Sequence, residues 1–321
     1  MGAGGLVERG EYAKVVCDSI TEWGDRLTTF EVRYCRFVLA EFNTHRTFSR
    51  NSESSRAVPF PKKLARVQEL PAGPVVWSGE QKGMQGGDEI DEPALAELEW
   101  LEARDSAIAH AQRLAEMGVH KSIVNRILEP FMWHTVVVSS TAWENFFRQR
   151  VSGLAQPEIR LPAELMLDAY KNSQPRLLQP GEWHLPYVED EDWGSLAKLL
   201  GDSHLGKSMY PEMVRISSAR CARVSYLTQA GKRDLQEDLN LWTRLTSASP
   251  MHASPLEHPA TPAQWNRQEL GFYPNPITDE WEPIEVDLAT QILTLPKVGN
   301  FLGWQQHRLA VELSAGWQSF S

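Results

Sequence analysis

The chain has 321 residues and a mass of 36.3 kDa, enough for one large domain or two ordinary ones. Apolar residues make up 42% and charged residues 23%, which predicts a packed core rather than disorder. The net charge of −10 argues against a protein that coats nucleic acid, because such binding needs many contacts to phosphates. With no apolar leader, no long apolar run and three scattered cysteines, we expect a soluble cytoplasmic protein without a membrane segment.

The first predicted feature is a β-hairpin. Residues 12–20 and 28–34 read as strands, and Trp23-Gly24-Asp25 between them reads as a turn. In the second strand the side chains alternate: one face is expected to carry Thr28, Phe30, Val32 and Tyr34, and the other Thr29, Glu31 and Arg33.

The middle of the chain alternates between helical and extended patterns. Up to Gly118 we expect a helix over 35–46, a polar non-helical run over 49–60, a loop over 71–93, and a long helix from Pro93 to a stop at Gly118. After it we expect a short helix containing Arg126, a strand over 132–140, and a helix begun by a capping box at Thr141–Glu144. A further helix should start at Pro157, with a kink or a later start at Pro162.

The C-terminal part is less regular. We expect an irregular surface insertion over 174–211, a strand or tight turn over 215–226, and helices over 235–245 and 299–313. Together these elements predict an α+β fold in a single domain, 1–321, with insertions near 71–93 and 174–211.

The segment 44–56 holds the densest set of hydrogen-bond donors. It contains three arginines, one histidine and six hydroxyls, a composition that suits phosphate oxygens, although a solvated serine-rich loop would have the same composition. No glycine-rich phosphate loop accompanies it.

Other candidate residues are open to two interpretations. His252, Glu257 and His258 could ligate a metal, but their spacing fits no familiar metal motif, so we expect none. Arg126 and Arg150 sit on helices where an arginine is either a surface residue or points into a cleft.

Five blocks of this sequence resemble the flavin-dependent thymidylate synthases (ThyX-like proteins). The blocks are His45-Arg46 with Ser49, Asn51, Ser54 and Arg56; Ala222-Arg223-Val224-Ser225; His252-Ala253-Ser254-Pro255-Leu256-Glu257-His258; Gly118-Val119 through Arg126-Ile127-Leu128; and Asn145-Phe146 to Arg150 with Ala155-Gln156-Pro157-Glu158-Ile159. In the common family order the second and third blocks precede the first. This chain therefore resembles a circularly permuted long variant of the kind that bacterial viruses encode, and its late blocks should fold back against residues 45–56.

The resemblance implies a fold, ligands and residue roles. The fold would be a central antiparallel sheet flanked by long helices, assembled as a homotetramer in the cytoplasm, or the host cytoplasm if virus-encoded. FAD would be the cofactor, and NADPH, methylenetetrahydrofolate and a pyrimidine deoxynucleotide monophosphate the substrates. The implied FAD-binding residues are His45, Arg46, Asn51, Asn145, Ser225 and Ser254.

The implied nucleotide-binding residues are Glu41, Ser54, Ser55, Arg56, Arg126 and Arg150. Arg56, Arg126 and Ser54 would hold the 5′-phosphate, and Arg150 the base carbonyls. The implied catalytic residues are Ser54, Arg150, His252 and Glu257, with Ser54 as a binding group and not a nucleophile.

The sequence also departs from the family pattern. Thr44 replaces the first arginine of the hallmark, Ser52 stands where the family has Glu, and Glu41 where it commonly has Gln. The first function expected is methylation of dUMP to dTMP. Hydroxymethylation at C5, action on dCMP, or nucleotide binding without catalysis are the alternatives.

Overall fold

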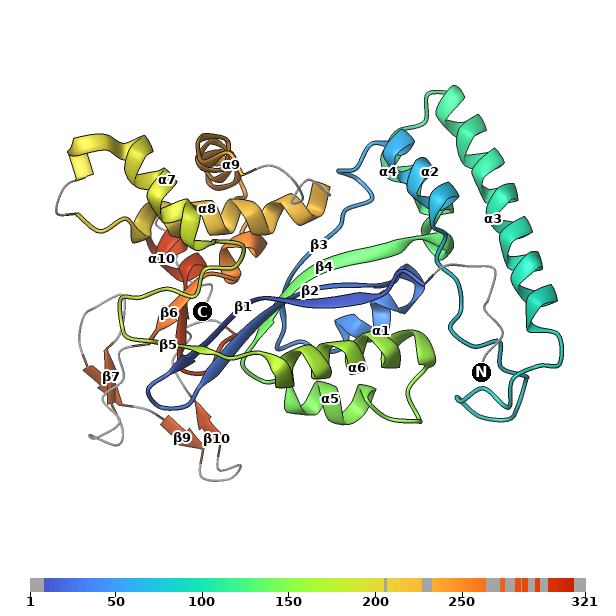
Figure 1. Cartoon of the computed structure of the whole chain (residues 1–321), viewed down its shortest axis with the longest axis horizontal. Coiled ribbons are helices and arrows are strands. Elements are labelled where there is room, and N and C mark those ends of the chain that lie inside the picture. Colours follow the sequence, from blue (N-terminus) through green and yellow to red (C-terminus); the bar gives the residue numbers. More distant parts are fainter. Residues whose placement is uncertain are drawn as a thin grey trace.

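The computed structural model describes residues 9–204, 207–226, 233–263 and 300–314, and four short strands between residues 272 and 294. Among these residues, none of the helices combines the length and apolar character that a membrane-spanning segment needs. The fold is α+β, as predicted, with helices on both faces of a central sheet (Figure 1).

A five-stranded sheet forms the centre of the molecule. Its strands, in the spatial order β3-β4-β2-β1-β5, are β3 (Ser49–Ser52), β4 (Trp133–Ser140), β2 (Arg26–Cys35), β1 (Tyr12–Thr21) and β5 (Arg176–Leu178). All neighbours are antiparallel except β5, which runs parallel to β1. The predicted hairpin is therefore confirmed, with Gly24 in its turn at a φ of 89°.

One face of the sheet is apolar and packs on two helices, α5 (Glu144–Arg150) and α6 (Pro157–Asn172). Phe30, Val32 and Tyr34 of β2 all point into this core, which confirms the predicted alternation. The ring of Phe30 meets that of Trp143 edge to face at 5.0 Å. Helix α6 begins at Pro157 and continues through Pro162, so a later start is wrong.

The opposite face of β2 is polar, with Thr29, Glu31 and Arg33. It is covered near β4 by the end of α8 (Tyr210–Arg223) and by η4 (Val224–Tyr226), where Val137 packs against Cys221 and Val224. The expected strand or turn over 215–226 is therefore wrong. Serines and β-branched residues suggested a strand, but α8 is stabilised by packing along α9 (Leu235–Ser247) and by buried ion pairs.

A second group of helices lies at the end of the sheet that is farther from α8 and α9. It consists of α2 (Phe60–Glu69), α3 (Pro93–Glu116), α4 (Lys121–Ile127) and η2 (Glu129–Phe131), which share a second apolar core (Figure 1). The predicted long helix, its end near Gly118, and the short helix containing Arg126 are confirmed.

The capping box expected at Thr141–Glu144 is wrong. Trp143 is the N-cap of α5 and makes no side-chain cap hydrogen bond. The Thr141 hydroxyl instead accepts a hydrogen bond from the backbone N–H of Leu302, 2.9 Å away. A contact distant in sequence thus takes the oxygen that a local cap would have used.

The remaining elements refine several expectations. They are η1 (Arg36–Val38), α1 (Leu39–Asn43), α7 (Asp190–Leu200), η3 (Gly201–His204), η5 (Ser254–Glu257), β6 (Ala260–Pro262), β7 (Phe272–Pro274), β8 (Trp281–Pro283), β9 (Glu285–Asp287), β10 (Ile292–Thr294), β11 (Trp304–Gln306) and α10 (His307–Ser314). The helix expected over 35–46 is two short helices. The segment 174–211 is not irregular, because it contributes β5 and α7. The helix expected over 299–313 begins only at His307, after β11; residue 299 lies outside the described residues.

Candidate functional site

Three residues that are far apart in the sequence meet at Asn51, on the edge strand β3. The Asn51 amide nitrogen donates to the backbone oxygen of Cys221 at 2.7 Å and lies 3.2 Å from the Ser225 hydroxyl. The Ser254 hydroxyl donates to the Asn51 amide oxygen at 3.1 Å. The late blocks therefore fold back against residues 45–56, which confirms the convergence that the permuted order predicts.

The backbone strengthens this junction. The N–H of Ser54 donates to the carbonyl of Ser225 at 3.1 Å, so the loop after β3 is fastened to η4. Asn51 is buried, Ser225 is partly buried and Ser254 is exposed. The cluster thus reaches from the protein interior to its surface, and its hydroxyl side is open to a ligand.

A second cluster surrounds Arg150. Its Nε donates to His45 Nε2 at 3.0 Å, and its Nη2 donates to the Thr44 hydroxyl at 3.1 Å and the Glu41 carbonyl at 3.3 Å. Burial, with the charges of Arg150 and Arg50, lowers the pKa of His45 to about 4. His45 is therefore neutral at pH 7, and its Nε2 can accept the hydrogen bond from the Arg150 Nε–H. This hydrogen bond holds both side chains in place.

The predicted phosphate-binding residues lie together between β3 and α4. The Ser54 hydroxyl accepts from the backbone N–H groups of Arg56 and Ala57 at 3.2 and 3.3 Å. The Ser55 hydroxyl donates to Glu129 at 2.8 Å, and Arg126 reaches the same carboxylate oxygen at 3.4 Å. Arg126 is thus beside Ser55, with Glu129 as the acceptor that they share.

The remaining predicted site residues differ in how exposed they are and in which residues they contact. Glu257, on η5, is half-buried and paired with Arg308 of α10. His252 is exposed, and its backbone N–H donates to Leu245. Arg46 is exposed. Asn145 is exposed on α5, where its side chain accepts from Arg148 and Gln149; the described contacts do not join it to Asn51.

Sequence reasoning missed the ion pairs that hold α8 in place. The carboxylate of Asp238, fully buried on α9, accepts from Arg220 at 2.9 Å and from Arg223 at 2.7 Å. Arg220 also pairs with Asp192 of α7 at 2.6 Å. The arginine of the Ala222–Ser225 block therefore positions the helix end that presents Ser225, and an aspartate 15 residues downstream is its partner.

A buried chain of hydrogen bonds runs across the polar face of the sheet. It joins His258 to Ser139 (2.8 Å), Ser139 to Thr29 (2.6 Å), Thr29 to His184 (2.8 Å) and His184 to Ser19 (2.9 Å). Burial lowers the pKa of both histidines to about 3, so both are neutral. The chain anchors the segment after η5, and hence Ser254 and Glu257, to three strands.

The C-terminal elements support the site from a further side. The Gln306 side chain donates to the Ser49 hydroxyl at 3.0 Å and to the Glu257 carbonyl at 2.8 Å. No pattern in the sequence pointed to these supports. Among the described residues, no group of three or more His, Cys, Asp or Glu side chains could hold a metal ion.

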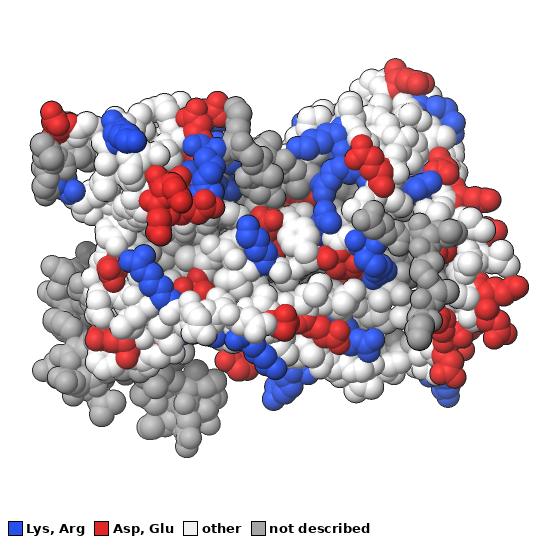
Figure 2. Space-filling model, viewed as in Figure 1, with Lys and Arg blue, Asp and Glu red and all other residues white. Residues whose placement is uncertain are grey.

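One arginine of the predicted phosphate-binding residues is left without a carboxylate partner in the described part of the chain. Figure 2 shows Lys and Arg side chains beside Asp and Glu side chains, both over the helices α7–α9 and over the helices α2–α4. Arg56 is exposed and makes no ion pair with any described carboxylate. An exposed guanidinium of this kind is available to an anionic ligand.

Comparison with known proteins agrees with the sequence analysis. A family model described as thymidylate synthase complementing protein matches residues 26–176. The predicted family resemblance is confirmed. The matched range includes His45, Asn51, Arg56, Arg126 and Arg150, whereas the blocks at 222–225 and 252–258 lie beyond it. No curated protein sequence matches this chain.

Two of the solved structures that are similar to part of this chain come from one protein. Both are crystal structures of a UMP/dUMP methylase, PolB, from Streptomyces cacaoi. The one bound to 5-Br dUMP is 17% identical, covers 51% of this chain and 91% of its own, and has a TM-score of 0.38. The one bound to 5-Br UMP is 15% identical, covers 51% of this chain and 90% of its own, and has a TM-score of 0.40.

Proposed function

We propose that this protein is a flavin- and folate-dependent enzyme that transfers a one-carbon unit to C5 of a pyrimidine deoxynucleotide, converting dUMP to dTMP with NADPH as the reductant. The observation that carries the proposal is the set of hydrogen bonds joining Asn51 to Ser225 and Ser254. These residues come from three family motifs, and they would be unrelated neighbours in a protein of another kind.

The 5′-phosphate of the nucleotide would bind at Ser54, Arg56 and Arg126. Because the Ser54 oxygen already accepts from two N–H groups, its own hydrogen is free to donate to a phosphate oxygen. Arg126 is more than half exposed, and its contact to Glu129 is long at 3.4 Å. A dianionic phosphate can therefore compete with that carboxylate for the guanidinium.

Arg150 would contact the pyrimidine base. Its guanidinium is oriented by neutral His45 and by Thr44, so its charge is held in place before the substrate arrives. A fixed cation beside the base carbonyls stabilises negative charge that develops on the ring when C5 attacks a one-carbon unit. Glu41, whose backbone carbonyl accepts from Arg150, would lie beside the same base.

FAD would bind beside the hydroxyl and amide groups around Asn51. The hydroxyl oxygens of Ser225 and Ser254 would accept hydrogen bonds from the flavin or its ribityl chain, because their hydrogens face the Asn51 amide oxygen. His45 and Arg46 would lie along the flavin, and His252 and Glu257 would face the substrate path. When reduced, the flavin supplies the hydride that completes the methyl group. Asn145, which lies apart from this cluster, would contact the FAD of a neighbouring subunit in a homotetramer.

The test begins with the purified protein. We expect flavin absorbance near ~450 nm, or its appearance on addition of FAD. Asn51→Ala should lose FAD, whereas Asn172→Ala, at the exposed end of α6, should retain it. If the wild-type protein neither carries nor binds FAD, the proposal fails.

Substrate and product are tested separately. The enzyme is incubated with NADPH, methylenetetrahydrofolate and either dUMP or dCMP, and the nucleotide product is identified by mass. We expect dTMP from dUMP; a product with one more oxygen, or a product only from dCMP, would replace this substrate assignment. Arg56→Ala should abolish nucleotide binding, and Arg113→Ala on α3 should not.

A further inference from the structure

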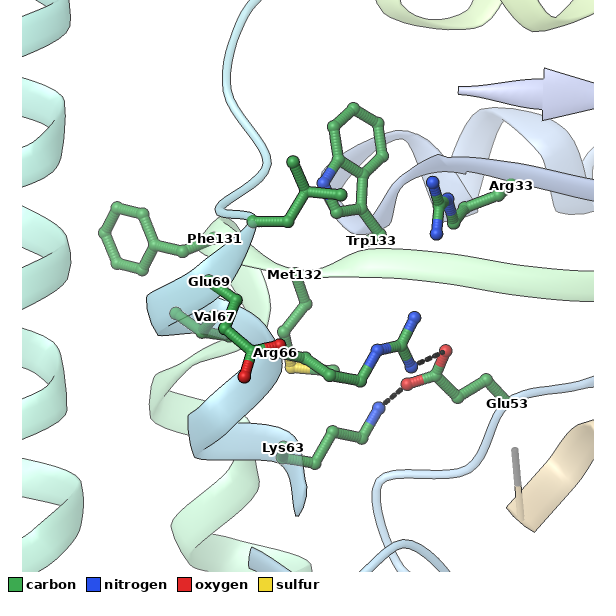
Figure 3. Close-up of a pocket in the computed structure, with 10 residues that line it drawn as sticks. Arg33, Glu53, Lys63, Arg66, Val67, Glu69, Phe131, Met132 and Trp133 are labelled. Carbon is green, nitrogen blue, oxygen red and sulfur yellow. Dashed lines mark hydrogen bonds and ion pairs between the residues drawn. The ribbon is translucent and has the colours of Figure 1, made fainter. Parts of the chain in front are cut away.

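A small cavity lies between α2 and the end of the sheet where β2 and β4 meet (Figure 3). Its volume is about 190 Å³. A dry cavity of ~150 Å³ is known to accept a benzene-sized molecule, whereas pockets for larger ligands start near ~300 Å³. The cavity is therefore too small for a nucleotide or a flavin, and it suits a molecule of about one ring and one substituent.

One part of the lining is positively charged. Arg33 and Arg66 supply two guanidinium cations, and the carboxylates are Glu53 and Glu69. Burial lowers the pKa of the third basic side chain, Lys63, to about 6, so Lys63 is mostly neutral at pH 7. Glu53 is already shared by Lys63 and Arg66, and Glu69 is exposed at the rim. Of the three basic side chains, Lys63 and Arg66 are therefore paired with a carboxylate of the lining.

Arg33 is the least neutralised of the three. It makes no ion pair with a described carboxylate; its Nε donates to the backbone oxygen of Gly10, and its guanidinium lies 4.9 Å from the ring of Tyr12. Burial lowers the pKa of Arg33, and the charge of Arg66 lowers it further, against the opposing charges of Glu11 and Glu31. An anion placed between the two guanidinium groups would relieve this repulsion.

The rest of the lining is apolar and partly flat. Phe131 and Met132 precede β4 and Trp133 begins it, and Val67 of α2 lies near Met132 (Figure 3). Leu70, the residue after α2, completes this part of the lining. The Arg33 guanidinium is 5.9 Å from the Trp133 ring, so the charged and apolar parts adjoin. Such a surface favours an apolar ring over a hydrated inorganic ion.

We propose that this cavity binds a small organic acid whose body is an aromatic or similarly flat apolar ring. The carboxylate lies between Arg33 and Arg66, and the ring lies against Trp133. This site is separate from the proposed nucleotide and flavin site, and the proposal does not depend on that function.

The experiment uses benzoate as the probe, titrated into the full-length protein by isothermal calorimetry. Benzamide has the same shape without the charge, and inorganic phosphate has charge without the ring. Benzoate is expected to bind at least about tenfold more tightly than either. Equal binding of benzamide would overturn the anion site, equal binding of phosphate would overturn the ring site, and no benzoate binding up to about 10 mM would overturn both.

Variants locate the binding. Arg33→Gln is expected to weaken benzoate binding at least about tenfold, and Arg113→Gln on α3 should leave the affinity for benzoate unchanged. Because Arg33 also contacts Gly10 and Tyr12, a second variant keeps the charges: Leu70→Trp fills the cavity and should abolish binding. Wild-type affinity in both folded variants would show that benzoate binds elsewhere and would overturn the proposal.

Discussion

The two faces of the central sheet are both buried, but they are stabilised in different ways. The face under α5 and α6 is filled by aromatic and branched side chains that need only shape complementarity. The opposite face carries Ser19, Thr29 and Ser139, whose hydroxyls are paired with buried histidines. Polar groups buried without partners would cost the fold about 1–3 kcal/mol each.

The difference shows where the fold can support chemistry. The polar face is covered by segments that come late in the chain, from His184 to His258, and these segments bring Ser225 and Ser254 to Asn51. Hydrogen bonds and ion pairs have fixed directions, so they fix the geometry of a site more narrowly than apolar packing does. The apolar face stabilises the sheet, and the polar face positions the candidate site.

The largest expected effect comes from the ion pairs that hold α8 over the polar face. Asp238→Asn keeps the size of the side chain but leaves Arg223 buried without its carboxylate. We expect the free energy of unfolding to fall by about 3–5 kcal/mol, measured by urea denaturation. Glu102→Gln, an exposed charge change on α3, is the control. A loss no larger than that of the control would mean that the ion pairs are dispensable.

The second largest expected effect is a loss of folding stability in acid, caused by the two buried histidines of the polar face. His184 and His258 have pKa values lowered to about 3, whereas in the unfolded chain they titrate near ~6.5. Above pH 6.5 both states are neutral and the stability is full; between about 6.5 and 3 only the unfolded state gains protons. Each histidine should therefore cost about 1.4 kcal/mol per pH unit in that range, or about 2 kcal/mol by pH 5.

The contribution of one histidine can be separated from that of other groups. His184→Gln keeps a polar side chain that can bond Thr29 but does not titrate. Its unfolding free energy, measured between pH 7 and pH 5, should fall by about 2 kcal/mol less than that of the wild type over this interval. His110→Gln, on the exposed side of α3, should leave the slope unchanged. Parallel slopes for wild type and His184→Gln would contradict the burial argument.

Much of the fold was predictable where the determining signal is local. The alternation of Phe30, Val32 and Tyr34 predicts which face of β2 is buried, and Pro93 and Gly118 bracket the long helix. Strand alternation and helix boundaries depend on neighbouring residues, so one sequence is enough to read them.

The failures share one cause, which is a partner distant in the chain. Residues 215–223 form a helix because Arg220 and Arg223 meet Asp238. The hydroxyl of Thr141 does not cap α5, because Leu302 takes it. Local propensity is only a weak prior when a tertiary contact competes for the same group.

The candidate site also contains residues that the sequence predicts and residues that it does not. Asn51, Ser225 and Ser254 could be found because family motifs mark them, and the structure brings them together. Their supports could not be found. Gln306 reaches Ser49 across 257 positions, and the chain from His258 to Ser19 crosses three strands. Supporting residues of this kind carry no motif, since many polar side chains could fill the same role.

The sharpest comparison of the two faces uses two adjacent residues of β4. Val137 and Val138 are both fully buried, but Val138 packs in the aromatic core whereas Val137 packs against Cys221 and Val224 beneath Ser225. Changing either to Ala removes the same buried methyl groups, so each should cost about 2 kcal/mol of unfolding free energy. Only Val137→Ala should also weaken FAD binding, by about threefold to tenfold, because only that side chain supports the helix end that presents Ser225.

Fluorescence titration with FAD measures the affinities, and urea denaturation shows whether the two variants are matched in stability. If both variants lose affinity equally, FAD binding follows global stability, and the division between a stabilising face and a positioning face would be wrong.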